Sequence, residues 1–287
     1  MKSLITLASV CFLITGCENK SEKTQQEKIN PSKVFATAEE KSIFDGKIID
    51  LTHTFSKETV YWVTAKEFKL DTVAYGETDS GFFYSANNFE TAEHGGTHID
   101  APIHFAANTQ TVDEIPLEKL MGAAIKIDVS ARSKNNPDYL ITVEDFTNWE
   151  KEHGQIPNGT IILLETGYAA YYPDKVKYLG TDERGSEAVA KLHFPGLSPE
   201  AAKWLVENRN IKSIGLDTAS IDYGQSTDFQ SHVILLSENI PAFENVANLD
   251  KLPVKGFQVI ALPMKIKGGS GGPLRIIAII SETKNNQ

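Results

Sequence analysis

The chain has 287 residues and a formal net charge of −10, with 41% hydrophobic and 23% charged residues. This composition is typical of a globular protein that buries a core, and it excludes a fibrous or wholly disordered chain. The acidic charge is not interrupted by a Lys/Arg-rich stripe, so we expect no nucleic-acid partner.

The N-terminal residues have the features of an export signal. Lys2 is followed by an apolar run at 4–14 and by two small residues,. The run is too short to span a bilayer. Its end, Ile-Thr-Gly-Cys, resembles the bacterial lipoprotein signal, which implies a signal peptide at 1–16 and a lipid on Cys17. The lipid would anchor an extracytoplasmic protein to a bacterial membrane. The alternative is a plain secretory signal with an incidental cysteine.

The next segment, 17–42, is dominated by Lys, Glu, Gln, Ser, Thr and Asn. Few large apolar side chains are present to offset the entropy of ordering it, so we expect a flexible tether. Residues 43–287 then form one domain. Cys11 and Cys17 are the only cysteines, and both precede it. A transition-metal site in the domain must therefore be built from His, Asp and Glu.

Three of the seven histidines fall within the segment 94–105, which reads HGGTHIDAPIHF. Gly95 and Gly96 disfavour a helix here. They predict instead a tight loop that lets the imidazoles of His94 and His98 converge.

Beyond this loop, His98, Asp100 and His104 have even spacing. In an extended segment their side chains would point to the same side. Imidazole and carboxylate ligands suit zinc, manganese or iron, and a carboxylate can bridge two ions. For any one histidine alone, a structural hydrogen-bonding role would be favoured. The four polar side chains together predict a metal site.

Short apolar runs alternate with helical patterns along the rest of the chain. A helix is predicted after Thr142, which has Asp145 three residues later, and another after Ser198, which precedes a proline. These patterns predict a single-domain α/β fold. An all-β sandwich would leave the segments around Trp149 and Trp204 unexplained. The runs predicted as buried strands are 123–129, 160–164, 211–216, 259–262 and 274–280,.

Several residues outside the histidine segment are candidates for the surroundings of a pocket. Asp217, Ser220 and Asp222 follow a predicted strand, where open α/β sheets often place functional groups; stabilisation of a turn is an equal alternative. The glycine-rich run 268–272 lacks the Lys-Ser/Thr of a phosphate loop, so we interpret it as a permissive loop. The aromatic candidates, each with a place in the core as its alternative, are Tyr61, Trp62, Phe82, Phe83 and Tyr168,.

The segment 94–105 resembles the signature His-x-Gly-Thr-His-x-Asp-x-Pro-x-His-Phe of the cyclase family, which includes bacterial kynurenine formamidases and isatin hydrolases. Every fixed position of that signature is present. The resemblance covers most of the chain from about Asp50 onward. Its later segments are 215–222, His232, 240–245, 260–263 and 268–273.

The resemblance implies a mixed-sheet swivelling β/β/α fold and metal-dependent hydrolysis of an amide C–N bond by an activated water. The implied substrate is a small molecule, either N-formylkynurenine or a cyclic amide such as isatin. Another cyclic amide or a lactone is an alternative. A second alternative is a non-catalytic metal- or ligand-binding lipoprotein, which the presence of His104 disfavours. The resemblance is compatible with a homodimer.

Carried over by position, the resemblance implies that His94, His98 and Asp100 bind one or two ions of zinc or manganese, with Asp100 able to bridge them. It implies that His232 and Glu244 are the remaining ligands. Taken alone, these two would be interpreted as a core-edge histidine and a solvated acid. His104 corresponds to the residue that transfers protons; the alternative is that it only orients Asp100.

Overall fold

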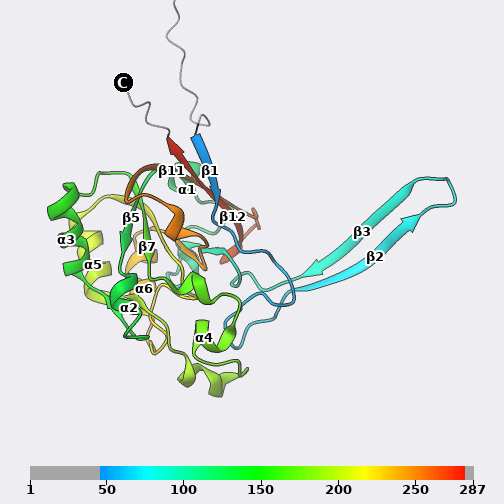
Figure 1. Ribbon diagram of the computed structural model, residues 1–287, viewed down its shortest axis with the longest axis horizontal. Helices are drawn as coiled ribbons and strands as arrows, with labels where there is room; N and C mark the ends of the chain where they lie inside the picture. Colours follow the sequence, from blue (N-terminus) through cyan, green and yellow to red (C-terminus); the bar gives the residue numbers. More distant parts are fainter. Residues whose placement is uncertain (1–45, 282–287) are drawn as a thin grey trace, which may run out of the picture. The chain divides into compact units, whose positions relative to one another are not determined.

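The structure, a computed structural model, describes residues 46–281 (Figure 1). The predicted signal peptide, Cys17 and the tether at 17–42 lie outside these residues. Within the described part of the chain, no helix is both long enough and apolar enough to cross a membrane.

A mixed sheet of eight strands forms the centre of the fold, in the order β1-β12-β11-β5-β7-β9-β10-β4. Because β4 also pairs with β12, all strands except β1 form a closed, barrel-like ring. The bounds are β1 (Gly46–Asp50), β4 (His98–Asp100), β5 (Met121–Asp128), β7 (Thr160–Glu165), β9 (Ile211–Leu216), β10 (Ala242–Glu244), β11 (Lys255–Pro263) and β12 (Gly271–Ser281).

The predicted strands and the two predicted helices are confirmed, so the all-β alternative is wrong. The carboxylate of Asp145 accepts a hydrogen bond of 2.8 Å from the backbone N–H of Thr142, and the Ser198 hydroxyl accepts one of 3.1 Å from Ala201. These bonds satisfy free donors at the two helix starts. Figure 1 shows α3 and α5 side by side. The α-helices are α1 (Leu117–Leu120), α2 (Ser130–Ser133), α3 (Val143–His153), α4 (Lys175–Leu179), α5 (Pro199–Asn208) and α6 (Gln230–Ser237).

Two hydrophobic cores lie on opposite faces of the sheet. In β7, Ile161 and Leu163 belong to one core, and Ile162 and Leu164 belong to the other. Successive side chains of a strand point to opposite faces. A strand in the middle of a parallel stretch that is covered on both faces therefore reads as a continuous apolar run, which is why β7 was recognisable in the sequence.

The three-residue strand β4 closes the ring because it is paired on both edges. His98 lies opposite Glu244 of β10 and Pro273 of β12, while Asp100 lies opposite Gly271. At Gly271 a Cβ atom would lie 2.4 Å from the Ile99 carbonyl oxygen and 2.6 Å from an atom of the His94 ring. The first residue of β12 must therefore be glycine for β4 to pair here.

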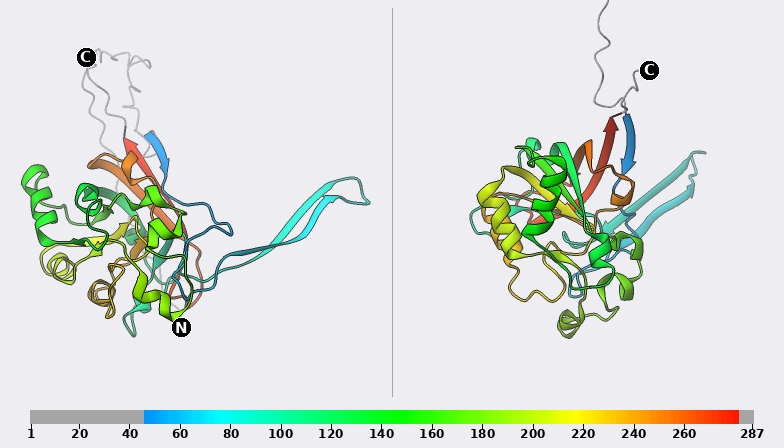
Figure 2. Two further views of the ribbon diagram at one scale, coloured as in Figure 1. Left: turned by 60° about the horizontal axis from the view of Figure 1, so that its bottom comes forward. Right: turned by 60° about the vertical axis from the view of Figure 1, so that its left-hand side comes forward.

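A separate two-stranded ribbon is formed by β2 (Lys69–Glu77) and β3 (Phe83–Glu90), neither of which was predicted from the sequence. The ribbon projects away from the main sheet in each view (Figures 1 and 2). Most of its side chains are exposed. The remaining short strands, β6 (Leu140–Ile141) and β8 (Gly196–Leu197), pair with each other.

We predict that Gly271→Ala lowers the free energy of unfolding by about 1–3 kcal/mol, because the added methyl group forces β4 and β12 apart. Gly272→Ala is the matched control, since its Cβ atom would meet no atom closer than 3.3 Å. Urea unfolding followed by circular dichroism measures both variants. Equal stability of the two variants would contradict this account of the closure.

Candidate metal centre and catalytic pocket

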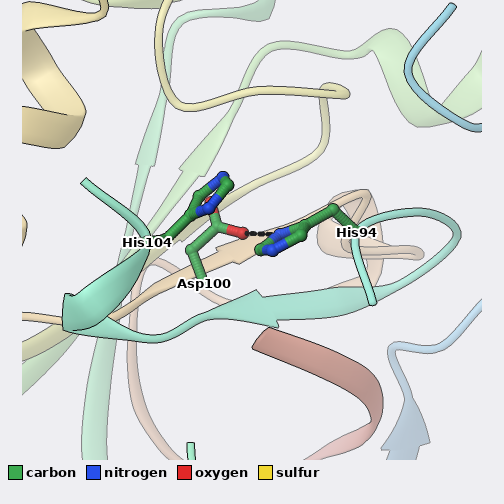
Figure 3. Close-up of side chains that lie close together, drawn as sticks. All are labelled: His94, Asp100 and His104. Carbon is green, nitrogen blue, oxygen red and sulfur yellow. Dashed lines mark hydrogen bonds and ion pairs between the residues drawn. The ribbon is translucent and has the colours of Figure 1, made fainter. Parts of the chain in front are cut away.

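The six polar side chains singled out in the sequence converge beside β4. They come from different parts of the chain: the loop before β4, β4 itself, the short 3-10 helix η2 (Pro102–His104), the first turn of α6, and β10. Figure 3 shows three of them facing one another. The six are His94, His98, Asp100, His104, His232 and Glu244.

The loop that presents His94 is tight, as predicted. Gly95 forms an isolated bridge with Tyr61, and a Cβ atom at Gly95 would lie 2.0 Å from the Tyr61 ring. Gly96 has a positive φ of 57° and donates a backbone hydrogen bond of 2.8 Å to Val60. Glycine alone adopts such a backbone beside an aromatic ring without strain.

The expectation that an extended backbone aligns His104 with His98 and Asp100 is wrong. Pro102 begins η2, so the strand ends before His104. The His104 side chain nevertheless reaches the cluster, where its ring stacks on His94 with centroids 3.8 Å apart. The turn at Pro102 thus replaces strand alternation as the feature that positions His104.

His98 is held through its outer ring nitrogen. Its Nδ1 lies 2.9 Å from the Gly96 carbonyl oxygen, which can only accept a hydrogen bond, so Nδ1 carries the proton. The inner nitrogen, Nε2, is buried and has no hydrogen-bond partner among residues 46–281. It lies 3.3 Å from Asp100 Oδ1 and 3.4 Å from Glu244 Oε2.

His232 is held in the same way by Asp222. Its Nδ1 donates a hydrogen bond of 2.6 Å to Asp222 Oδ2, whose carboxylate also accepts backbone bonds from Ser231 and His232 in the first turn of α6. The inner Nε2 then faces two carboxylates, at 3.1 Å from Asp100 and 3.2 Å from Glu244.

His94 is likewise held by its outer nitrogen, which contacts a serine in the glycine-rich loop. The Ser270 hydroxyl donates to Glu93 Oε2 at 2.6 Å, so the 2.9 Å contact between Ser270 Oγ and His94 Nε2 requires the imidazole to donate. His94 Nδ1 is left facing Asp100 Oδ1 at 2.6 Å, the contact dashed in Figure 3.

Three imidazole nitrogens therefore present lone pairs to two buried carboxylates. An arrangement of acceptors alone is costly unless a cation or protons occupy it. Burial would raise the pKa of Asp100, but the adjacent imidazoles of His232, His94 and His98, which take up protons when no ion is bound, lower it well below its usual value. Burial would lower the pKa of His232, but its carboxylate partners raise it well above the usual value. Both pKa shifts show that positive charge is favoured at the centre of the cluster.

These donors fit a divalent transition metal. The buried, unpartnered Nε2 of His98 points at the carboxylates, and nitrogen and carboxylate donors suit zinc or manganese. His94, Asp100 and His104 offer one group of atoms within 4.8 Å of one another, and His98, Asp100 and Glu244 offer a second. Asp100 belongs to both groups, as expected of a bridging carboxylate.

His104 differs from the other histidines, because no hydrogen bond from the described part of the chain reaches its ring nitrogens. It therefore does not orient Asp100 through a hydrogen bond. Burial lowers the pKa of His104 to about 4, although the Asp100 charge acts in the opposite direction. A neutral imidazole with a free nitrogen can accept a proton.

The cluster forms the floor of a cavity of about 280 Å³. Tyr61 and Trp62 line it as predicted, together with Ser220. The rings of Phe105 and Phe229 lie 5.3 Å apart at its wall. The full lining comprises Val60, Tyr61, Trp62, Ala65, His94, Gly95, His98, Asp100, His104, Phe105, Ala219, Ser220, Phe229, His232, Glu244 and Asn245.

The other aromatic candidates lie elsewhere. Phe82 and Phe83 are exposed on the projecting ribbon, so they are not part of this chain's cavity wall. Tyr168 is buried in a separate apolar cluster with Tyr178 and Phe194, which is the core alternative stated for it. An aromatic residue packs well in a core, a pocket or an interface, so its type alone did not distinguish these places.

Sequence reasoning missed some of the residues that hold the cluster. Glu93 and Ser270 were not considered, because the glycine-rich loop gave no local signal that it lies against His94. Asp222 was left open between a pocket role and a turn role; it caps α6 and orients His232. Asp217 takes the turn role, since it accepts backbone hydrogen bonds from the segment after β7.

We predict that Asp222→Asn weakens the binding of zinc and manganese by about 10–100-fold, because His232 loses the carboxylate that fixes its ring and raises its basicity. Chelator competition measures the affinity, and circular dichroism checks the fold. Asp250→Asn, an exposed change outside the cavity, is the matched control. Unchanged affinity of Asp222→Asn would show that His232 is not a ligand.

Comparison with known proteins identifies the family. A family model described as putative cyclase matches residues 49–223. The isatin hydrolase of Roseibium aggregatum is 32% identical over 81% of this chain and 86% of its own. The kynurenine formamidase of Salinibacter ruber is 25% identical over 80% of this chain and 96% of its own.

Solved structures of isatin hydrolases resemble this fold over most of the chain. Isatin hydrolase A from Labrenzia aggregata, bound to benzyl benzoate, superposes with a TM-score of 0.75 at 33% identity over 82% of this chain and 94% of its own. An isatin hydrolase bound to the product analogue thioisatinate gives 0.76 at 28% identity over 83% and 94%. The mixed α/β fold expected from the resemblance is confirmed. The protein belongs to the cyclase family.

Proposed function

We propose that this protein is a metal-dependent hydrolase that opens a small, neutral aromatic lactam such as isatin. The observation that carries the proposal is the convergence of three lone-pair imidazole nitrogens on two buried carboxylates, at the floor of an apolar cavity beside neutral His104. Relatives named isatin hydrolase and kynurenine formamidase support this reaction class.

The cavity wall favours a neutral substrate. Trp62, Phe105 and Phe229 provide apolar rings, which suit a flat aromatic molecule. No Lys or Arg of the described residues lines the cavity. N-formylkynurenine carries a charged amino-acid group, and burying its carboxylate without a cationic partner would be costly. An uncharged lactam avoids this cost, so N-formylkynurenine is the second candidate.

The metal proposed here is zinc or manganese, as one or two ions. His94, His98 and Asp100 would hold it, with His232 and Glu244 as the remaining ligands. Glu244 is positioned for this by a hydrogen bond of 2.6 Å from the Ile221 backbone N–H. When bound, the ion lowers the pKa of water and polarises the substrate carbonyl.

The chain's own contribution to the chemistry is proton transfer by His104. Its neutral imidazole accepts a proton from the water that attacks the carbonyl carbon. The imidazolium returns that proton to the ring nitrogen as the C–N bond breaks, which yields a carboxylic acid and an amine. The aromatic side chains of the cavity wall orient the plane of the substrate ring,.

We predict that His104→Ala lowers kcat/KM for isatin by about 10²–10⁴-fold with metal content unchanged. Metal content is measured by elemental analysis, and turnover is measured on isatin and on N-formylkynurenine after stripping and reloading with zinc or manganese. Full activity of His104→Ala would overturn the role of this residue. A metal-loaded enzyme that hydrolyses neither substrate would overturn the substrate class.

The pH profile separates this role from a structural one. Protonation of His104 removes the proton acceptor, and its pKa is about 4. Protonation of His104 should therefore add a loss of activity as the pH falls through this region, and a nearby metal ion would move that loss to still lower pH. His104→Ala should lack this acidic limb; a variant that keeps the same limb would contradict the assignment.

For the location, we propose an extracytoplasmic protein anchored to a bacterial membrane by a lipid on Cys17. The support is the sequence pattern at 4–17. We predict that Cys17→Ser releases the protein from the membrane fraction, because a serine has no thiol to carry the lipid. Fractionation followed by immunoblotting measures this. Membrane retention of Cys17→Ser equal to that of the unaltered chain would contradict the lipid anchor.

A further inference from the structure

The cavity wall contains two oxygen-bearing side chains that the metal cluster does not use. Of the other lining side chains with oxygen atoms, two carboxylates belong to the cluster, and the Tyr61 hydroxyl contacts the Thr91 hydroxyl at 2.5 Å. Ser220 and Asn245 remain. Both are buried, with 4% and 2% of their surface exposed. A buried amide is costly unless it is paired, so each end of the Asn245 amide needs a partner.

Asn245 reaches the cavity because its backbone leaves the path of the strand. In β10, Phe243 points into a hydrophobic core and Glu244 into the cavity. Alternation along an extended strand would send Asn245 to the core with Phe243. Instead Asn245 has a positive φ of 52° and lines the cavity beside Glu244. Such a backbone persists where its surroundings hold it, often at functional sites. Here the Asn245 N–H donates to the Thr218 carbonyl at 2.8 Å, and the Asn245 carbonyl accepts from the Thr97 hydroxyl at 2.7 Å.

The hydroxyl of Tyr178 determines which end of the amide faces the cavity. Tyr178 is fully buried, and its Oη lies 3.0 Å from the Asp217 carbonyl oxygen and 2.9 Å from Asn245 Oδ1. Both oxygens can only accept, yet the hydroxyl has one proton. A half-turn of the amide exchanges its oxygen for its nitrogen without a change of shape. Tyr178 then donates to Asp217 and accepts from Asn245 Nδ2, so every group is paired and Oδ1 faces the cavity.

The result is a neutral acceptor held in one direction at the cavity wall. No other hydrogen bond to the Asn245 side chain comes from residues 46–281, so Oδ1 is available to a ligand. The Ser220 hydroxyl differs, because it rotates and can donate or accept. The fixed amide oxygen therefore distinguishes a ligand that offers an N–H group from one that does not.

We propose that Asn245 Oδ1 accepts a hydrogen bond from the ring N–H of the lactam and thereby selects substrates whose ring nitrogen is unsubstituted; this role rests on the proposed function. Burying a lactam N–H in an apolar cavity is costly without an acceptor, and Asn245 supplies one. The N–H bond lies in the plane of the lactam ring. Holding it there leaves the lone pair that develops on nitrogen, as the C–N bond breaks, free to take the proton from His104.

N-methylisatin separates this contact from general binding in the cavity. It keeps the aromatic ring and both carbonyl groups of isatin, but a methyl group replaces the N–H hydrogen. Oδ1 would be left buried and unpaired against that methyl group. The unaltered enzyme should therefore have a kcat/KM for isatin at least about tenfold higher than that for N-methylisatin, because a site built for a hydrogen bond rejects an analogue that lacks it.

Asn245→Gly removes the amide at little structural cost, because glycine adopts a positive φ freely and Tyr178 can still donate to Asp217. In this variant the preference for isatin should fall to within about threefold of unity. Asn248→Gly is the matched control: it makes the same change at a positive φ of 57° outside the cavity, and it should keep the full preference. Elemental analysis and circular dichroism should show the same metal content and fold in all three proteins. A merely structural effect would lower both rates together and leave their ratio unchanged.

Calorimetric binding of both lactams to zinc-loaded His104→Ala, which should not consume them, separates this contact from the reaction. Tighter binding of isatin that is lost when Asn245→Gly is added supports the contact; if neither lactam is hydrolysed by the unaltered enzyme, only the proposed function is overturned. Equal binding of the two lactams, or a preference that survives Asn245→Gly, would overturn the contact. Loss of the preference in Ser220→Ala alone would assign the N–H to that hydroxyl instead. No binding of either lactam would overturn both the contact and the function.

Discussion

The pairing of β4 on both edges is the constraint on which the rest of the structure depends. A strand of three residues has few hydrogen bonds of its own, yet this one joins β10 to β12 and closes the sheet. Its register sets Glu244 opposite His98 and Gly271 opposite Asp100. A slip of one residue would turn His98 and Asp100 to the other face. Closure of the fold and assembly of the metal cluster are therefore the same event.

In the metal cluster, the hydrogen-bond partner of each histidine's outer nitrogen determines how its inner nitrogen is protonated. Each of three imidazoles is held by its outer nitrogen: His98 by a backbone carbonyl, His232 by Asp222, and His94 through Ser270. The inner nitrogens are thereby kept as lone pairs facing carboxylates. Such a set costs stability without a cation, and ion binding would be expected to stabilise the fold by mass action. Occupancy of the site by a cation and the stability of the fold are therefore linked.

The sequence was sufficient for elements whose signals are local. Continuous apolar runs indicated the buried strands, and Thr142 and Ser198 indicated the helix starts. The histidine segment indicated a metal site. The prediction of an extended backbone beyond Pro102 was wrong, because a 3-10 turn begins there and ends the alternation of the strand. His232 could be linked to the site only by family resemblance, since it is distant in the sequence. The projecting ribbon was missed because a ribbon without a buried face lacks the alternation of buried and exposed side chains on which strand prediction relies. Phe83 was assigned to a pocket because an aromatic residue type alone does not distinguish a pocket from an exposed ribbon.

The central claim is that one metal centre is assembled on the closing strand. The most direct test is anomalous diffraction from crystals of the protein saturated with zinc or manganese, recorded at the absorption edge of the metal. The account predicts a peak at about 2.0–2.3 Å from His98 Nε2 and from the Asp100 carboxylate. Peaks confined to surface sites, or none at this cluster in metal-saturated crystals, would contradict it.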